Sequence, residues 1–316
     1  MKYAIGGISG KTGEKFSVEV PLQGVAPKPQ PRPAPAPAPK PAQAGGGDEP
    51  LVGPNGKDPD PPKAQARPGY DLLPDDLKAR YLKASFTAEG EQIQISLEHL
   101  IYQNLGLNER CFMDTKNVLV GLFNEAKKKD PAFLETLGEQ GKGGPTFIMH
   151  AFSGKGSPEQ HQACLKIAAH YPKRLGRDWK DMGSLSASLN TFYFSFMGLD
   201  CSGFAGNYAR AIGTKLEPNS PIPSFAPPNM RRTKVDDILG GDVIIWGKRH
   251  IATIQGRRPD GNFDIVEAND EPEVLGLGYT VREIKETGTD SLKIRKLYDG
   301  KPRSSTFEDV YVATLK

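Results

Sequence analysis

The sequence predicts an α+β protein in which a mainly helical part precedes an antiparallel sheet. Two patterns carry this prediction. Apolar residues recur at helical spacing between residues 73 and 180, and three strand-forming runs separated by short turns occupy residues 241–269. A third observation sets the N-terminus apart, because 14 of the 28 prolines lie between Pro27 and Pro68. We therefore expect the folded part of this 316-residue chain to begin near Tyr70.

The N-terminal region is predicted to contain a short segment, residues 1–24, and a linker, residues 25–69. Every second residue from 27 to 41 is proline, which removes backbone donors and favours extended geometry, so the linker is expected to be semi-rigid there. Residues 15–20 alternate polar and apolar side chains and predict one strand. Because one strand does not fold alone, we expect residues 1–24 to dock on a partner's sheet edge, for example on a secretion-machine carrier. A disordered tail is the alternative.

Composition excludes several classes of function. The net charge of +3 gives no basic field, so we expect no nucleic-acid partner. No run of about 18 apolar residues predicts a membrane helix, and glycines and lysines interrupt residues 1–24, which excludes a secretory signal and predicts synthesis in the cytoplasm. The three cysteines are far apart, and no His/Cys/Asp cluster has metal-ligand spacing, so we expect no disulfide framework, no metal and no cofactor.

Residues 70–190 are predicted to form a mainly helical subdomain with three recognisable helices. Asp114 is expected to cap the first, which ends at three lysines before Asp130. Pro131 is expected to begin the second and Ser157 to cap the third. No chemistry is assigned to this part, and its polar or reactive residues are interpreted as structural: Cys111, Cys164, His99, His150, His161 and His170.

Cys201 is predicted to lie in the first turn of a helix. Asp200 is a natural N-cap, apolar residues follow at helical spacing, and Gly213 is a favoured stop. Unpaired amide donors and the positive end of the helix dipole favour thiolate over thiol at this place. The position fits a catalytic nucleophile, although a cysteine without function also occurs there.

Residues 241–269 predict an antiparallel meander of three strands, 241–246, 250–254 and 263–269, with a turn centred near Pro259. This centre places His250 opposite residue 268, between Glu267 and Asn269, which share one face of their strand. A small register shift sets either residue opposite His250. A histidine held by a carboxylate or an amide is the base-and-orienter half of a nucleophilic triad.

Together these motifs carry a resemblance to a known group of enzymes. Residues 200–204 (DCSGF), 241–246 (GDVIIW), 250–252 (HIA) and 266–269 (VEAN) resemble the NlpC-type papain-like cell-wall peptidases and the related CHAP amidases. DCSGF is typical of the former and the Glu-x-Asn end of the latter. The resemblance implies a papain-like α+β fold in residues 191–316, with the nucleophile helix packed on the antiparallel sheet.

The resemblance also implies hydrolysis of peptide or amide bonds of peptidoglycan through an acyl-enzyme. Cys201 would be the nucleophile, His250 would transfer protons, and Glu267 or Asn269 would orient His250. NlpC-type members more often have a second histidine where this chain has Glu267, so the third residue is left open.

Three further residues are assigned to the oxyanion or substrate side of this site. Ser202 and Asp200 flank the nucleophile, and first-turn amides there would hold the oxyanion. Tyr193 is the candidate for a tyrosine that family members place upstream of the cysteine. A buried aromatic residue is the alternative for Tyr193.

Other segments are expected to frame the site. The proline-rich residues 214–233 predict an extended loop bordering the cleft, and residues 279–286, 292–297 and 310–315 predict strands that extend the sheet.

The route to peptidoglycan and the substrate class are both left open. A specialised secretion machine, a phage holin or lysis could release the protein to act in the periplasm or wall of a target cell, and an antibacterial effector would have an immunity protein as partner. The alternatives are a toxin that modifies a host protein as a deamidase, transglutaminase or protease, and a non-catalytic binding protein on the same scaffold.

Overall fold

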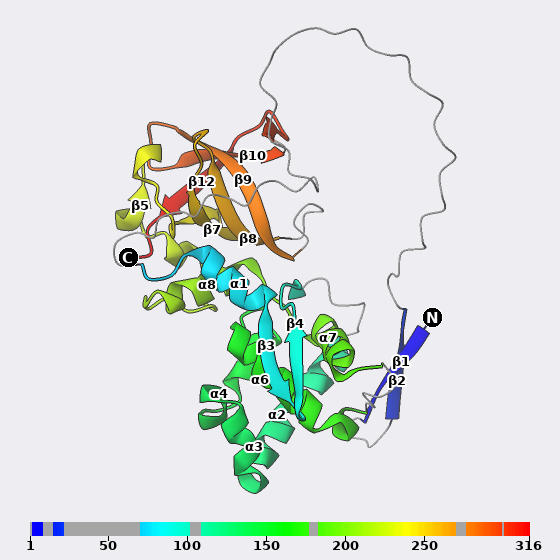
Figure 1. Cartoon of the computed structure of the whole chain (residues 1–316). Coiled ribbons are helices and arrows are strands. Elements are labelled where there is room, and N and C mark those ends of the chain that lie inside the picture. The colour runs from blue at the N-terminus through cyan, green and yellow to red at the C-terminus, as the bar shows by residue number, and fades with distance from the viewer. Residues whose placement is uncertain are drawn as a thin grey trace, which may run out of the picture.

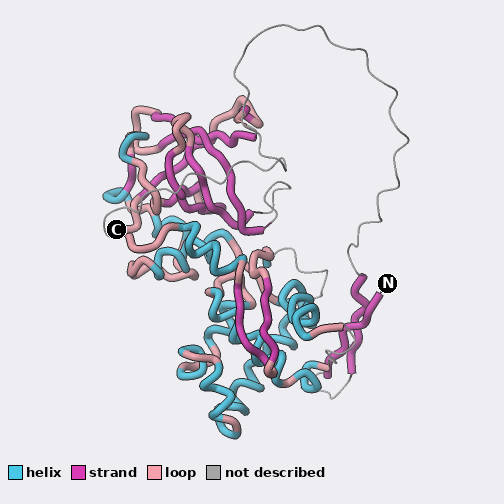
Figure 2. Tube along the Cα trace, in the orientation of Figure 1, coloured by secondary structure: helices cyan, strands magenta, loops and turns pink. Residues whose placement is uncertain are grey.

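The computed structural model describes residues 2–8, 15–21, 70–101, 109–176, 183–269, 276–298 and 300–316, so the predicted linker lies outside the described residues. The described part is a mixed α+β structure with an antiparallel sheet, which confirms the predicted class. Most helices gather in one half and most strands in the other (Figure 2). Helices α1 (Pro74–Leu82) and α8 (Cys201–Ala211) lie between the two halves (Figure 1).

The helical half confirms two of the three predicted helix starts. Asp130 caps α3 by accepting a hydrogen bond from the Phe133 amide, and Ser157 caps α6 in a reciprocal capping box. Each helix has proline in its first turn, where the missing N–H costs nothing. The helices of this half are α2 (Glu109–Lys129), α3 (Pro131–Thr136), α4 (Glu139–Lys142), α5 (Thr146–Ala151), α6 (Pro158–His170) and α7 (Leu185–Phe196).

The third predicted start is wrong. Helix α2 begins at Glu109, so Asp114 lies inside the helix and does not cap it. The physical reason is that Cys111 is buried and lies about two turns before Leu119, on the same helix face. The apolar stripe therefore extends further toward the N-terminus than the predicted start allows.

A β-hairpin interrupts the stretch that we predicted to be mostly helical. Strands β3 (Ala84–Ala88) and β4 (Glu91–Ile95) pair antiparallel around a two-residue turn, Glu89–Gly90, in which both residues have positive φ. Burial alternates along both strands. This alternation with a period of two is visible in the sequence. It predicts strands here, although the segments that follow have a helical pattern.

The prediction of a single strand in residues 1–24 is also wrong. Strand β2 (Lys15–Pro21) exists, but it pairs antiparallel with β1 (Lys2–Ile8) of the same chain. Glycines in β1 weaken its alternating pattern of polar and apolar residues, so the sequence did not predict this strand. Since β2 has a partner within the chain, a lone strand is no longer a reason to expect docking, and a carrier for residues 1–24 stays a prediction.

The strand half is an antiparallel meander that closes on itself. The predicted order is confirmed, and β12 pairs with both β10 and β6, so that six described strands form a closed sheet. Two short strands, β5 (Arg231–Arg232) and β11 (Lys301–Pro302), flank it. The six strands are β6 (Val243–Trp246), β7 (His250–Arg257), β8 (Phe263–Asn269), β9 (Gly276–Glu286), β10 (Leu292–Tyr298) and β12 (Glu308–Ala313).

The register between β7 and β8 differs by one residue from the predicted one. Thr253 lies opposite Val266, where a turn centred at Pro259 would place Ile265. An irregularity between Ile254 and Gly256 shifts the pairing. Within residues 214–233 the chain forms two short helices, η4 (Ile222–Phe225) and η5 (Pro228–Met230), before β5. That this segment borders the cleft stays a prediction.

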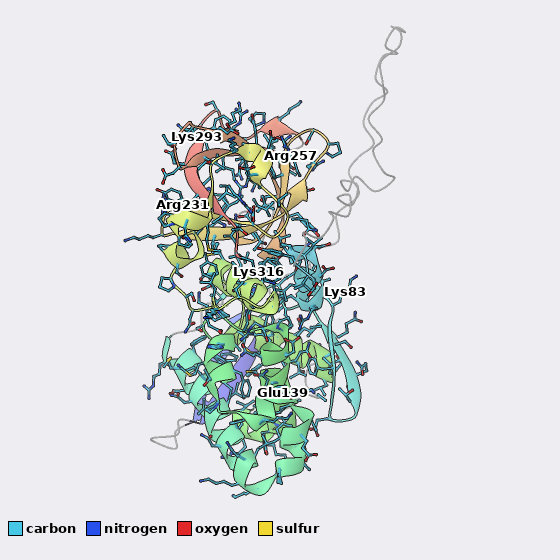
Figure 3. The ribbon with its side chains drawn as sticks, turned by 90° about the vertical axis from the view of Figure 1, so that its left-hand side faces the viewer. Lys83, Glu139, Arg231, Arg257, Lys293 and Lys316 are labelled. Atoms are coloured by element: carbon cyan, nitrogen blue, oxygen red, sulfur yellow. The ribbon has the colours of Figure 1, made fainter. Side chains whose placement is uncertain are left out.

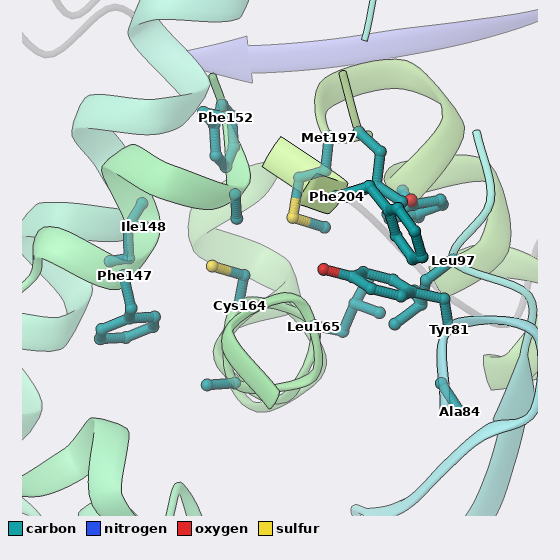
Figure 4. Packing of buried hydrophobic residues seen from close by; sticks show 14 of the residues in the cluster. Tyr81, Ala84, Leu97, Phe147, Ile148, Phe152, Cys164, Leu165, Met197 and Phe204 are labelled. Atoms are coloured by element: carbon teal, nitrogen blue, oxygen red, sulfur yellow. The ribbon is translucent and has the colours of Figure 1, made fainter. Parts of the chain in front are cut away.

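One buried apolar cluster joins the two halves. Tyr81, Cys164 of α6 and Phe204 of α8 are fully or almost fully buried in it (Figure 4), and the Tyr81 hydroxyl donates to the Gly156 carbonyl at 2.8 Å. Burial raises the pKa of the Cys164 thiol, as expected for a cysteine that serves as a small hydrophobe. A second cluster lies in the closed sheet and includes Ile244, Ile254, Phe263, Ile265 and Leu292.

Charged side chains such as Arg257 and Lys293 surround the closed sheet on the outside (Figure 3). Among the described helices, none is both long and apolar enough to cross a bilayer.

The close approach of Gly203 on α8 to the Gly154 carbonyl yields a stability prediction. A Cβ at Gly203 would lie 1.8 Å from the Gly154 carbonyl oxygen, whereas one at Gly121, in the exposed middle of α2, would meet nothing within 4 Å. We expect Gly203→Ala to lower the free energy of unfolding by about 3 kcal/mol. Gly121→Ala should raise it by about 0.5–1 kcal/mol. Urea denaturation of both variants checks this, and equal effects would contradict the described contact.

Candidate active site

Cys201 is the first residue of α8, as predicted, and is partly exposed. Asp200 is the N-cap, and its Oδ1 accepts a hydrogen bond from the Gly203 amide at 2.5 Å. The amides of Cys201 and Ser202 belong to the first turn, whose N–H groups have no acceptor within the helix. The chain thus places the thiol beside unpaired donors and the positive end of the helix dipole, where negative charge is stabilised.

His250 faces Cys201 from the neighbouring strand. It is the first residue of β7, against which α8 packs, and the Cys201 side chain is close enough to be among the groups that raise the pKa of His250. Its Nε2 lies 2.7 Å from Oε2 of Glu267 and donates to it, since an ionised carboxylate only accepts. Nδ1 is then the nitrogen left for Cys201. The Trp246 ring, 5.1 Å from the His250 ring, packs beside it and limits its orientation.

Glu267 is fully buried, and its carboxylate is satisfied from three side chains. Besides His250, Thr280 donates to Oε1 at 2.5 Å and Arg282 donates to the same oxygen at 2.8 Å. Burial would raise the pKa of Glu267, but the His250 hydrogen bond, the Arg282 charge and the Thr280 hydroxyl hold it well below its usual range. Glu267 is therefore an anion that orients His250.

The pKa of His250 is the sum of opposing effects. Burial lowers the pKa of His250, whereas Cys201 and then the hydrogen bond and charge of Glu267 raise it, with a net value of about 9. At neutral pH His250 is consequently an imidazolium between Cys201 and Glu267.

Both residues that we considered as the partner of His250 lie on β8. Asn269 ends β8, half-buried, on the same face as Glu267. The side-chain hydrogen bond that holds His250 nevertheless comes from Glu267.

Tyr193 lies in the core and not in the group around Cys201. Its side chain, on α7, is fully buried, and its ring packs against those of His161 and His99 at 5.4 and 6.3 Å. Burial raises the pKa of Tyr193 well above its usual range. This placement matches the buried aromatic that we gave as the alternative.

Three side chains around this site were not found from the sequence: Thr280, Arg282 and Lys155. Trp246 was part of the motif at residues 241–246, but its packing against His250 was not predicted. Thr280 and Arg282 lie on one face of β9 and could have been placed near Glu267 only with the register between β8 and β9. Lys155 lies between α5 and α6, and its Nζ is 2.6 Å from Asp200 Oδ2 and in contact with Ser202 Oγ. No local pattern connects Lys155 with Cys201.

Comparison with known proteins gave no match to any family model, curated protein or solved structure. The geometry of Cys201, His250 and Glu267 is therefore the structural basis for a function of this protein.

The remaining histidines have structural partners. Burial lowers the pKa of His161 to about 4, and its Nε2 lies 3.2 Å from the Gly198 carbonyl oxygen. His170 stacks on Phe133 and lies between the carboxylates of Glu89 and Asp130 at 2.8 and 3.2 Å. Within the described residues no three His, Cys, Asp or Glu side chains are grouped so that they could hold a metal ion.

The raised pKa of His250 predicts how stability depends on pH. The folded protein binds the His250 proton more tightly than the unfolded chain, whose histidine has a pKa of 6.5. The stabilisation is therefore complete below about pH 6.5 and is lost as the pH rises through about 9. Relative to His250→Gln, we expect the wild-type advantage in unfolding free energy to shrink by up to about 2 kcal/mol across this window, allowing for partial exposure of the ring.

Urea denaturation at several pH values between 6 and 9.5 measures this difference. An advantage that grows with pH would contradict the raised pKa. His170→Gln is a matched control, because His170 also contacts carboxylates but lies away from Cys201.

Proposed function

We propose that this protein is a cysteine hydrolase that cleaves peptide or amide bonds of peptidoglycan. The observation that carries the proposal is the chain of contacts from Cys201 at the start of α8, through His250 on β7, to the buried Glu267 on β8. A thiol, an imidazole and a buried carboxylate in this order are the parts needed for nucleophilic catalysis of acyl transfer.

The contacts support the following reaction. Sγ of Cys201, as thiolate, attacks the carbonyl carbon, and first-turn amides stabilise the oxyanion that forms. The C–N bond breaks as His250 gives its proton to the leaving amine, which leaves a thioester on Cys201. Water then attacks the thioester while His250 takes a proton from it. The C–S bond breaks, and the acid product and the thiolate–imidazolium pair result, with Glu267 ionised throughout.

Two features favour a papain-like arrangement and a cell-wall substrate. Helix α8 packs on the antiparallel strands β7 and β8, so that nucleophile and base come from a helix and a sheet in contact. Three of the four motifs that resemble NlpC-type peptidases and CHAP amidases also converge, since residues 200–204, His250 and Glu267 meet at one place. The resemblance supports peptidoglycan as the substrate, and the geometry supports the reaction.

The first test compares wild type with Cys201→Ala on purified peptidoglycan. We expect new muropeptides from wild type and none from the variant, because the variant lacks the nucleophile. Analysis of the fragments by mass spectrometry also identifies the bond that is cleaved. Cys164→Ala is the control for loss of a thiol, since Cys164 is buried away from the site. If wild type releases no fragments, the cell-wall substrate is wrong, and host proteins become the substrates to test.

A second test separates the two candidates for the residue that orients His250. Glu267→Gln removes the charge that holds the imidazolium, and we expect kcat/KM to fall by about 10²-fold. Asn269→Ala should lower it by less than about threefold, because the bond that holds His250 comes from Glu267. Steady-state kinetics on a fragment identified in the first test measures both. The reverse order would assign the orienting role to Asn269.

A further inference from the structure

Lys155 brings a positive charge from the helical half to the N-terminus of the nucleophile helix. It lies between α5 and α6, and its Nζ contacts both residues that flank Cys201. The distance to Asp200 Oδ2 is 2.6 Å, and the other contact is with Ser202 Oγ, which in turn donates to Asp200 Oδ1 at 3.1 Å. The side chains are only 18% exposed for Lys155 and 9% for Asp200, so the ion pair is shielded from water.

The backbone around Lys155 is held by the same helix. The Lys155 carbonyl accepts a hydrogen bond from Asn207 of α8 at 3.0 Å, and the Gly154 carbonyl accepts one from the Asp200 amide at 3.0 Å. On the other side, the Lys155 amide donates to the His150 carbonyl of α5 at 2.9 Å. These backbone bonds fix the position of Lys155 relative to Cys201 independently of the contacts that its side chain makes.

The charge of Asp200 creates the need for this lysine. A buried carboxylate next to Cys201 in the chain opposes formation of the thiolate, because two anions repel strongly where water is excluded. On the sheet side, Cys201 faces His250, with Glu267 and then Arg282 behind it. On the loop side, the charged groups are Asp200 and Lys155.

We propose that Lys155 is a positioning residue that neutralises Asp200, so that the Cys201 thiolate forms beside a neutral pair and not beside a buried anion. Asp200 can then cap α8 without penalising the nucleophile. The inference rests on the proposed role of Cys201, and it makes the helical half part of the catalytic machinery.

The experiment is a charge cycle on the full-length protein: wild type, Lys155→Met, Asp200→Asn and the double variant. The readout is the pH profile of Cys201 alkylation by iodoacetamide, followed at that residue by mass spectrometry. Cys111 and Cys164 are buried and react slowly in the folded protein. Asparagine also caps helices, and the double variant leaves no buried charge unpaired, so it retains the fold even if Lys155→Met does not. Thermal unfolding monitors each variant.

We expect Lys155→Met to raise the midpoint of the profile by about one pH unit, which is a roughly tenfold slower reaction below the midpoint. Asp200→Asn should lower the midpoint, because the lysine charge is then uncompensated. The midpoint of the double variant should lie close to that of wild type. The midpoint of Lys155→Arg should also match that of wild type, because arginine keeps the positive charge. A structural role alone predicts that both single variants shift in one direction and that the double variant is at least as impaired.

The outcomes separate this inference from the proposed function. Shifts in one direction, or an unchanged profile in Lys155→Met, overturn the role of Lys155 and leave the nucleophile intact. Opposite shifts that cancel, in a protein that releases no muropeptides, support Lys155 and reject the substrate. If wild-type Cys201 reacts no faster than a free thiol near neutral pH, both the nucleophile and the role of Lys155 are rejected.

Discussion

Burial of the Glu267 carboxylate is the constraint on which the site depends. A charge without exposed surface costs several kcal/mol unless other groups replace the lost water. The sheet meets this requirement by its register. Glu267 lies opposite Gly278, so Thr280 and Arg282, two and four residues further along the same face of β9, can reach one oxygen diagonally. The other oxygen is left for His250 on β7.

The second requirement is that α8 fits tightly between the two halves, and small or polar residues at a few positions allow this fit. Gly203 allows the Gly154 carbonyl to approach the helix, and Asn207 binds the carbonyls of Lys155 and Gly156. At the sheet, Gly241 has a φ of +89°, and a Cβ there would lie 2.7 Å from the Tyr208 hydroxyl of α8. The glycines near Cys201 and before β6 thus set how closely α8 approaches the sheet that bears His250.

Local patterns in the sequence were sufficient to predict those parts of the site that depend on helix capping and on strand alternation. The cap at Asp200, the first-turn position of Cys201 and the strands bearing His250 and Glu267 follow from capping preference and alternation. The partners of these residues could not be found in this way. Lys155 is 45 residues from Asp200, and Arg282 is 15 residues from Glu267 across a strand boundary. A one-residue irregularity in β7 also changed the register that we used to place His250.

Two buried ion pairs lie near Cys201 and His250, and stability alone does not account for them. A buried ion pair contributes little net stability, since desolvation offsets most of the attraction. Here each pair lies on one side of the Cys201–His250 contact, Asp200 with Lys155 on the loop side and Glu267 with Arg282 on the sheet side. Each carboxylate has a geometric task, one capping α8 and the other orienting His250. If Cys201 is the nucleophile that we propose, the cations would let both tasks be performed without leaving an uncompensated anion beside its thiolate, and their benefit would lie in reactivity and not in the free energy of unfolding.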